Sequence, residues 1–208
     1  MSWLESIHKK LIFGGRVAAL VEGLSPLLPE NASVLDVGCG DGLLARQLMD
    51  KRGDLSLQGI DVLLRKQTHI PVTLYDGDRF PLDDNSVDVV MFVDVLHHTD
   101  NPQALLAEAN RVARKGVVIK DHLVSGAFAW QLLWLMDWVG NSHQGVALPC
   151  NYWEPSRWRQ AFDQLDLEAV GWNTRLGLYR WPLNWIFERN LHFVCRLEAD
   201  LSPKVAKV

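Results

Sequence analysis

The sequence predicts an α/β fold in which an open, doubly wound sheet carries helices on both faces. Strand-like runs alternate with helical runs between residues 33 and 122. The run 86–96 (SVDVVMFVDVL) is rich in β-branched residues and nearly continuously apolar, as expected for a parallel strand buried on both faces. A glycine turn joins the strand-like run 33–38 to the helical pattern 43–51. Together these features favour a parallel sheet over an all-helical or all-β protein.

The first half of the chain gives the elements in order. Segment 2–24 has apolar residues at helical spacing, interrupted at Gly14 and Gly15, which predicts two short helices. Strands are expected at 33–38, 55–61 and 71–76, and the helix 43–51 follows the first of them.

The second half continues the alternation and then departs from it. A helix at 101–114, with Pro102 near its first turn, and a strand at 116–122 follow the long apolar strand. Beyond residue 122 we expect helices and strands at 126–140, 155–165, 167–176 and 191–199. The segment 123–155 is predicted to be an insertion over the carboxyl edge of the sheet, where ligands bind in such folds.

The length of 208 residues suits one domain with a modest cap. We divide it into N-terminal helices, a cofactor-binding core, an aromatic cap, and a C-terminal helix with strands, at 1–30, 31–122, 123–155 and 156–208. A net charge of −4 gives no electrostatic reason to expect nucleic acid. Three widely spaced cysteines and the lack of a recognisable signal peptide predict a cytoplasmic protein.

The strongest motif is VLDVGCGDG at 34–42, because it ends a strand and opens a helix. Glycines without a Cβ allow a ligand to lie directly on the turn, and the following helix presents free N–H groups to an anionic group. The motif lacks the GK[ST] of a phosphate-binding loop, and Leu43 replaces the third glycine of a dinucleotide loop. The acid Asp36 inside the motif suits a ligand that carries a cationic amino group.

Two further acids follow the second and third predicted strands. Asp61 stands about twenty residues beyond the loop, where a carboxylate can accept both hydroxyls of a ribose. Asp78 could accept an adenine amino group, although on its own it reads more simply as a turn residue.

Taken together, VLDVGCGDG, QGID and DGDRFPLDDNSVDVVMFVDVLHHTDNPQALLAEANRV resemble the class I S-adenosylmethionine-dependent methyltransferases, most closely the small-molecule branch called type 11. The resemblance covers roughly residues 30–122. It implies a Rossmann-like sheet of seven mostly parallel strands with the last strand antiparallel. It also implies a set of cofactor contacts: Asp36, Gly38, Cys39, Gly40, Asp61, Val62, Asp78, Arg79 and Asp94.

His97 and His98 are the candidates for chemistry, because they follow the fourth strand and imidazole titrates in the right range for a general base. Alternatively, one of them lines the cofactor wall and the other caps the next helix. Asp94, Asp121 and His122 also stand at strand ends, but we expect no metal there.

The predicted cap carries a tryptophan stripe. Trp130, Trp134 and Trp138 recur every four residues, and Tyr152 follows in the same segment. A core helix that packs on the sheet explains this pattern. The sharper hypothesis is a pocket for a small hydrophobic or lipid-like acceptor. Peripheral membrane contact through Trp3, Leu4, Lys9 and Lys10 is a weaker extension.

The predicted function is therefore methyl transfer from S-adenosylmethionine to a small acceptor that the sequence does not identify. Two alternatives remain: a non-catalytic subunit with this fold, and a nicotinamide-dependent oxidoreductase. The sequence gives no oligomeric state.

Overall fold

The computed structural model of the chain describes residues 15–141, 149–179 and 181–199. Within these ranges it contains a sheet of seven strands in the order β3-β2-β1-β4-β5-β7-β6. The pairs among β1, β2, β3, β4 and β5 are parallel, whereas β7 runs antiparallel to both β5 and β6. The predicted Rossmann-like sheet with an antiparallel last strand is confirmed.

The sheet contains β1 (Ser33–Val37), β2 (Ser56–Asp61), β3 (Val72–Leu74), β4 (Val87–Val93), β5 (Ala113–His122), β6 (Leu167–Asn173) and β7 (His192–Ala199). The helices around it are α2 (Leu43–Lys51), α3 (Pro102–Val112), α4 (Ala129–Asn141), α5 (Pro155–Gln164) and α6 (Asn184–Phe187). Residues 15–24 are also helical, and two 3-10 turns are η1 (Ser25–Leu27) and η2 (Leu96–His98). The first of the two helices expected in segment 2–24 lies outside the described residues.

Strand β4 shows why the sheet has two cores. Its side chains alternate between faces. Val89 and Met91 belong to one buried cluster, whereas Val90 and Phe92 belong to the other. A strand that is covered on both sides must be apolar at successive positions, which explains the continuous run in the sequence.

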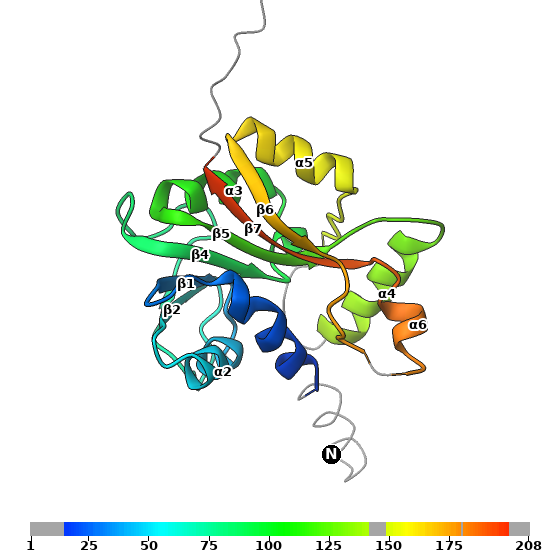
Figure 1. Ribbon diagram of the computed structural model, residues 1–208, viewed down its shortest axis with the longest axis horizontal. Helices are drawn as coiled ribbons and strands as arrows, with labels where there is room; N and C mark the ends of the chain where they lie inside the picture. The colour runs from blue at the N-terminus through cyan, green and yellow to red at the C-terminus, as the bar shows by residue number, and fades with distance from the viewer. Residues whose placement is uncertain (1–14, 142–148, 180, 200–208) are drawn as a thin grey trace, which may run out of the picture.

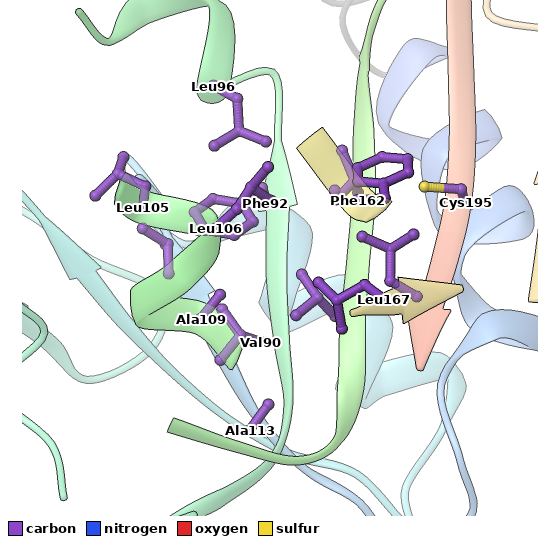
Figure 2. Close-up of a cluster of buried hydrophobic side chains, with 14 of the residues drawn as sticks. Val90, Phe92, Leu96, Leu105, Leu106, Ala109, Ala113, Phe162, Leu167 and Cys195 are labelled. Atoms are coloured by element: carbon purple, nitrogen blue, oxygen red, sulfur yellow. The ribbon is translucent and has the colours of Figure 1, made fainter. Parts of the chain in front are cut away.

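Helices cover both faces of the sheet (Figure 1). Leu24 of the N-terminal helix and Leu48 of α2 pack on one face. On the other face, Leu106 of α3 and Phe162 of α5 pack against the sheet, and Figure 2 shows both in one cluster with Cys195 of β7. This two-sided cover is the doubly wound arrangement that the alternation predicts.

Several element boundaries differ from the sequence prediction, and the differences at α3 and β4 have a clear physical reason. Helix α3 ends at Val112, so the predicted helical end at 113–114 is wrong, because Ala113 already pairs with Val87 of β4. Strand β4 stops at Val93 because Asp94 adopts a positive φ of 57°. The chain then turns into η2, which brings His97 and His98 to the end of β4.

The carboxyl ends of β1, β2, β4 and β5 lie along one edge of the sheet, because these strands are parallel. Helix α4 lies beyond the ends of β4 and β5 (Figure 1). Its Ala129 and Leu133 form a small buried cluster with Tyr152 and with Leu191, which follows α6.

Candidate functional site

The glycine loop between β1 and α2 is left-handed at three positions. Gly38, Gly40 and Gly42 have φ values of 68°, 61° and 74°. A Cβ at Gly42 would lie 2.4 Å from Cγ1 of Ile70, so this glycine is required by packing. A Cβ at Gly40 would meet no atom of the described residues within 4 Å. The backbone at Gly40 is thus open on the side where a ligand would approach.

The Asp61 carboxylate, at the end of β2, fastens this loop. Its Oδ2 accepts a hydrogen bond of 2.8 Å from the Gly40 amide, and its Oδ1 accepts one of 2.8 Å from the Leu63 amide. The residue is 8% exposed. Each carboxylate oxygen has a second acceptor position, so both remain able to accept a hydroxyl.

The Asp36 carboxyl is buried near Asp61. Burial, together with the charge of Asp61, raises the pKa of Asp36 to about 8. Among the described residues, none donates a hydrogen bond to its side chain. A buried, unpaired carboxylate is costly, and a cation beside it would remove that cost. The pKa of the neighbouring Cys39 thiol is also raised by burial, so this thiol stays neutral.

Apolar side chains are exposed directly after Asp61. Val62, Leu63 and Leu64 are 58%, 42% and 50% exposed. They offer a surface on which a flat ring such as adenine could stack. Asp78 and Arg79 are exposed on the loop after β3, and their amides both donate to Oδ1 of Asp76. Asp76 is therefore the residue that forms the turn, which leaves the Asp78 carboxylate outside it.

Asp94, at the end of β4, belongs to a charged group. Its carboxylate pairs with Arg16 at 2.7 Å and with the buried Lys120 of β5. Burial alone would raise the pKa of Asp94, but Lys120 and Arg16 hold it well below its ordinary value. Both cations contact this carboxylate, so Asp94 ties the N-terminal helix to β5 at the edge where the cofactor contact was expected.

His97 and His98 are placed together at this same edge, with ring centroids 4.0 Å apart. His97 is 1% exposed, and its Nδ1 lies 2.6 Å from Oδ1 of Asp121. Burial would lower the pKa of His97, but the carboxylates of Asp121 and Asp137 outweigh it and raise the pKa to about 10. Burial and the charge of His97 lower the pKa of His98.

Residues 35–119 match the family model for a methyltransferase domain. This range holds the glycine loop, Asp61 and the histidine pair. Residues 35–119 therefore form a methyltransferase domain. The resemblance found in the sequence is thereby confirmed.

Relatives of this methyltransferase domain align over part of their length. An uncharacterized methyltransferase from Mycobacterium bovis is 34% identical over 108 residues, which are 49% of this chain and 44% of the relative. The alignment thus spans less than half the length of that relative.

Solved structures share the fold of the methyltransferase domain. A chain from a Haloferax volcanii complex that contains the Trm112 methyltransferase activator has a TM-score of 0.65 at 16% identity, over 92% of this chain and 91% of its own. The geranyl diphosphate C-methyltransferase of Streptomyces coelicolor A3(2) has a TM-score of 0.64 at 14% identity, over 87% and 75%. At such identities the likeness concerns the fold.

The three tryptophans of α4 do not pack in the core of the protein. Trp130, Trp134 and Trp138 of α4 are 46%, 43% and 52% exposed, and the rings of Trp134 and Trp138 stack 6.4 Å apart. Leu133 is the fully buried residue of this helix. The interpretation of the stripe as a core face therefore does not hold.

Within the described chain, no helix combines the length and apolar character that crossing a membrane requires.

Sequence reasoning missed the contact between α4 and the methyltransferase domain. Asp137 is 6% exposed, and its Oδ2 accepts a hydrogen bond from the Tyr152 hydroxyl and lies 3.2 Å from Nε2 of His97. The signal in the sequence that could have revealed this contact was a single acidic residue, Asp137, inside the apolar run 127–140. Tyr152 was predicted to line a substrate pocket, and here it holds Asp137.

Proposed function

We propose that the chain transfers the methyl group of S-adenosylmethionine to a small acceptor. The observation that carries this proposal is the pairing of an open backbone at Gly40 with the buried carboxylates of Asp36 and Asp61. The carboxylate of Asp61 would accept the ribose hydroxyls, and Asp36 would face the cationic part of the cofactor.

The nearby residues suggest how the rest of the cofactor is held. The exposed side chains of Val62 and Leu63 would contact the adenine, with Asp78 beside its amino group. The N-terminus of α2 would receive the carboxylate of the amino acid portion. Methyl transfer is a displacement in line with the departing sulfur, and alignment and exclusion of water supply much of the acceleration. His97 and His98 lie at the strand end next to this place and are our candidates for handling an acceptor proton. His98 is the one that would accept it, because burial and the charge of His97 lower its pKa, whereas a pKa of about 10 keeps His97 protonated.

Transfer of a labelled methyl group tests the proposal. We expect label from methyl-labelled S-adenosylmethionine to enter an acceptor in a cell extract of the source organism when wild-type protein is added. The Asp61→Ala variant serves as the negative control, because it loses a cofactor contact, and thermal unfolding checks that it is folded. Label transfer at the same rate with the variant, or none with wild-type protein that binds the cofactor, would contradict the proposed activity.

The pKa of Asp36 gives a second test. A cation bound beside Asp36 favours its ionised form, so binding expels the proton that a carboxyl with a pKa of about 8 carries at lower pH. The amino group of S-adenosylhomocysteine is such a cation, so the affinity for this ligand should rise about 20-fold from pH 6 to pH 7.5 and level off above pH 8. Calorimetry across this range measures it.

The matched variant is Asp36→Asn, which keeps the shape and cannot titrate. It should bind more weakly at pH 8 and show a flat pH profile. The other groups that face Asp36 are the Asp61 carboxylate and the Cys39 thiol, and the raised pKa keeps that thiol neutral throughout. An equally steep profile in the variant would assign the titration to another group.

We further propose that the acceptor is apolar. Large apolar side chains are exposed on α4 and around α6, a set that we call the α4–α6 aromatic surface: Phe128, Trp130, Trp134, Trp138, Trp181, Leu183, Trp185 and Ile186. Exposure of these apolar side chains to water is unfavourable, whereas their contact with an apolar ligand or a lipid surface is favourable. Leu191, which follows α6, packs with Ala129 and Leu133 of α4. This contact joins the two segments near the carboxyl edge of the sheet.

Removing Trp134 should weaken use of an apolar acceptor. Burying one such side chain is worth about 1.5–3 kcal/mol, so Trp134→Ser should lower kcat/KM for that acceptor by about tenfold or more. The affinity for S-adenosylhomocysteine should stay unchanged. The control is Val170→Ser, on β6 and 52% exposed. Equal losses in the two variants, or methylation of polar metabolites alone, would contradict an apolar acceptor.

A further inference from the structure

Three side chains that can ligate a metal meet where α4 contacts the end of β4. His97, His98 and Asp137 each offer one ligand atom, and these atoms all lie within 4.8 Å of one another. Two come from η2, and the third comes from the middle of α4. Two imidazoles and one carboxylate form a donor set that binds divalent transition metals.

The Nε2 atom of His97 is the most informative atom of the three. It is buried, yet it forms no hydrogen bond with any described group. Oδ2 of Asp137 lies 3.2 Å away, in a charged contact that lacks the alignment of a good hydrogen bond. A metal ion held between the two atoms would displace the proton that the raised pKa of His97 keeps on the ring. Two ligands at about 2.1 Å from one tetrahedral metal ion lie about 3.4 Å apart, so this separation suits a shared metal.

The other side of the His97 ring is fixed as it is in metal-binding histidines. Its Nδ1 lies 2.6 Å from Oδ1 of Asp121, a hydrogen bond that orients the ring and leaves Nε2 as the ligand atom. Asp121 is itself held, because it accepts from the amides of Leu96 at 3.0 Å and His122 at 2.7 Å. The Tyr152 hydroxyl donates to Asp137 and steadies the third ligand. Outer partners of this kind characterise metal sites.

A second group, His97 with Asp121 and His122, also has donor atoms close together. It is the poorer site, because 2.6 Å between Nδ1 and Oδ1 is a hydrogen-bond distance and too short for two ligands of one ion. All three of its residues are fully buried, whereas His98 is partly exposed and gives an ion a way in.

We propose that Nε2 of His97, an imidazole nitrogen of His98 and the Asp137 carboxylate bind one divalent transition metal ion of the zinc type. Three protein ligands leave a coordination position open, as in catalytic rather than structural zinc sites. The open position would take an oxygen or sulfur atom of an acceptor, and with the ion bound the two imidazoles would act as ligands and no longer take a proton. Binding of the ion does not depend on the proposed methyl transfer.

Metal titration of the full chain tests the site. After removal of bound ions with a chelator, we expect one equivalent of Zn²⁺ to bind, and Co²⁺ to give visible absorption bands as it enters the same site. His98→Ala and Asp137→Asn should each lower the affinity for both ions at least tenfold. The matched controls are His69→Ala and Asp163→Asn, both exposed and far along the chain from the site. These should bind as the wild type does.

The variants are chosen to stay folded. His98 is partly exposed, and asparagine at 137 can still accept from Tyr152. Thermal unfolding with and without Zn²⁺ gives a second reading, because an ion that binds only the folded state raises Tm. Less than a tenth of an equivalent bound to folded wild-type protein would overturn the proposal, as would unchanged affinity in both variants. Binding of S-adenosylhomocysteine to chelated protein separates failure of this site from failure of the proposed function.

Discussion

Replacing Asp61 with alanine is expected to weaken binding of S-adenosylhomocysteine at least 100-fold. The two ribose hydroxyls would lose their hydrogen bonds to the carboxylate, and each such bond is worth about 1.5–3 kcal/mol when one partner is charged. The Gly40 amide would also lose its acceptor at 2.8 Å, so the loop would be less well ordered before binding. Calorimetric titration of wild type and variant measures the change.

The control for this prediction is Asp50→Asn, at an exposed position on α2 that pairs only with Arg46 of the same helix. It should bind the ligand as the wild type does. Thermal unfolding of both variants checks that any loss concerns binding. A loss of less than threefold in a folded Asp61→Ala variant would contradict the assignment of this carboxylate to the ribose.

Alanine at Gly40 and alanine at Gly42 should have opposite consequences. Gly42→Ala places a methyl group 2.4 Å from Cγ1 of Ile70 at a φ of 74°. The left-handed backbone costs about 1–2 kcal/mol and overpacking about 1–3 kcal/mol, so the free energy of unfolding should fall by about 2–5 kcal/mol. Gly40→Ala meets no atom of the described residues within 4 Å and should cost only the backbone part.

Ligand affinity should distinguish the two variants in the opposite sense, because Gly40→Ala should bind the ligand more weakly. The Cβ added at Gly40 would occupy the space on which the ligand lies, and a misfit of about 1–3 kcal/mol lowers affinity about 5- to 150-fold. Chemical unfolding and calorimetry on the same samples make the comparison. If Gly40→Ala binds S-adenosylhomocysteine as tightly as the wild type, the ligand does not contact this loop.

The residues that we propose for the cofactor side could be singled out in the sequence because they are close together along the chain. The glycine loop is a local structure, and the strand, turn and helix that surround it each have their own signal. Asp61 is further along, but it follows the next strand, and parallel strands bring their carboxyl ends to one edge. The parallel sheet followed from the same alternation, and its seven strands with an antiparallel last strand followed from the resemblance to a family.

The acceptor side could not be predicted, because its contacts join distant segments. Asp137 reaches His97 across 40 positions, and Arg16 reaches Asp94 across 78. No local pattern encodes such pairs. The start of β5 at Ala113 was missed for a related reason: helical spacing continues through Arg114, and pairing with β4 overrides that local preference.

The central claim is that the loop at 38–42, with Asp36 and Asp61, binds S-adenosylmethionine. Calorimetric titration of the chain with S-adenosylhomocysteine at pH 8, beside a titration with NADH, tests it most directly. We expect one binding site per chain for the nucleoside and no heat with NADH. A folded sample that gives no heat with S-adenosylhomocysteine, or that binds NADH instead, would contradict the claim.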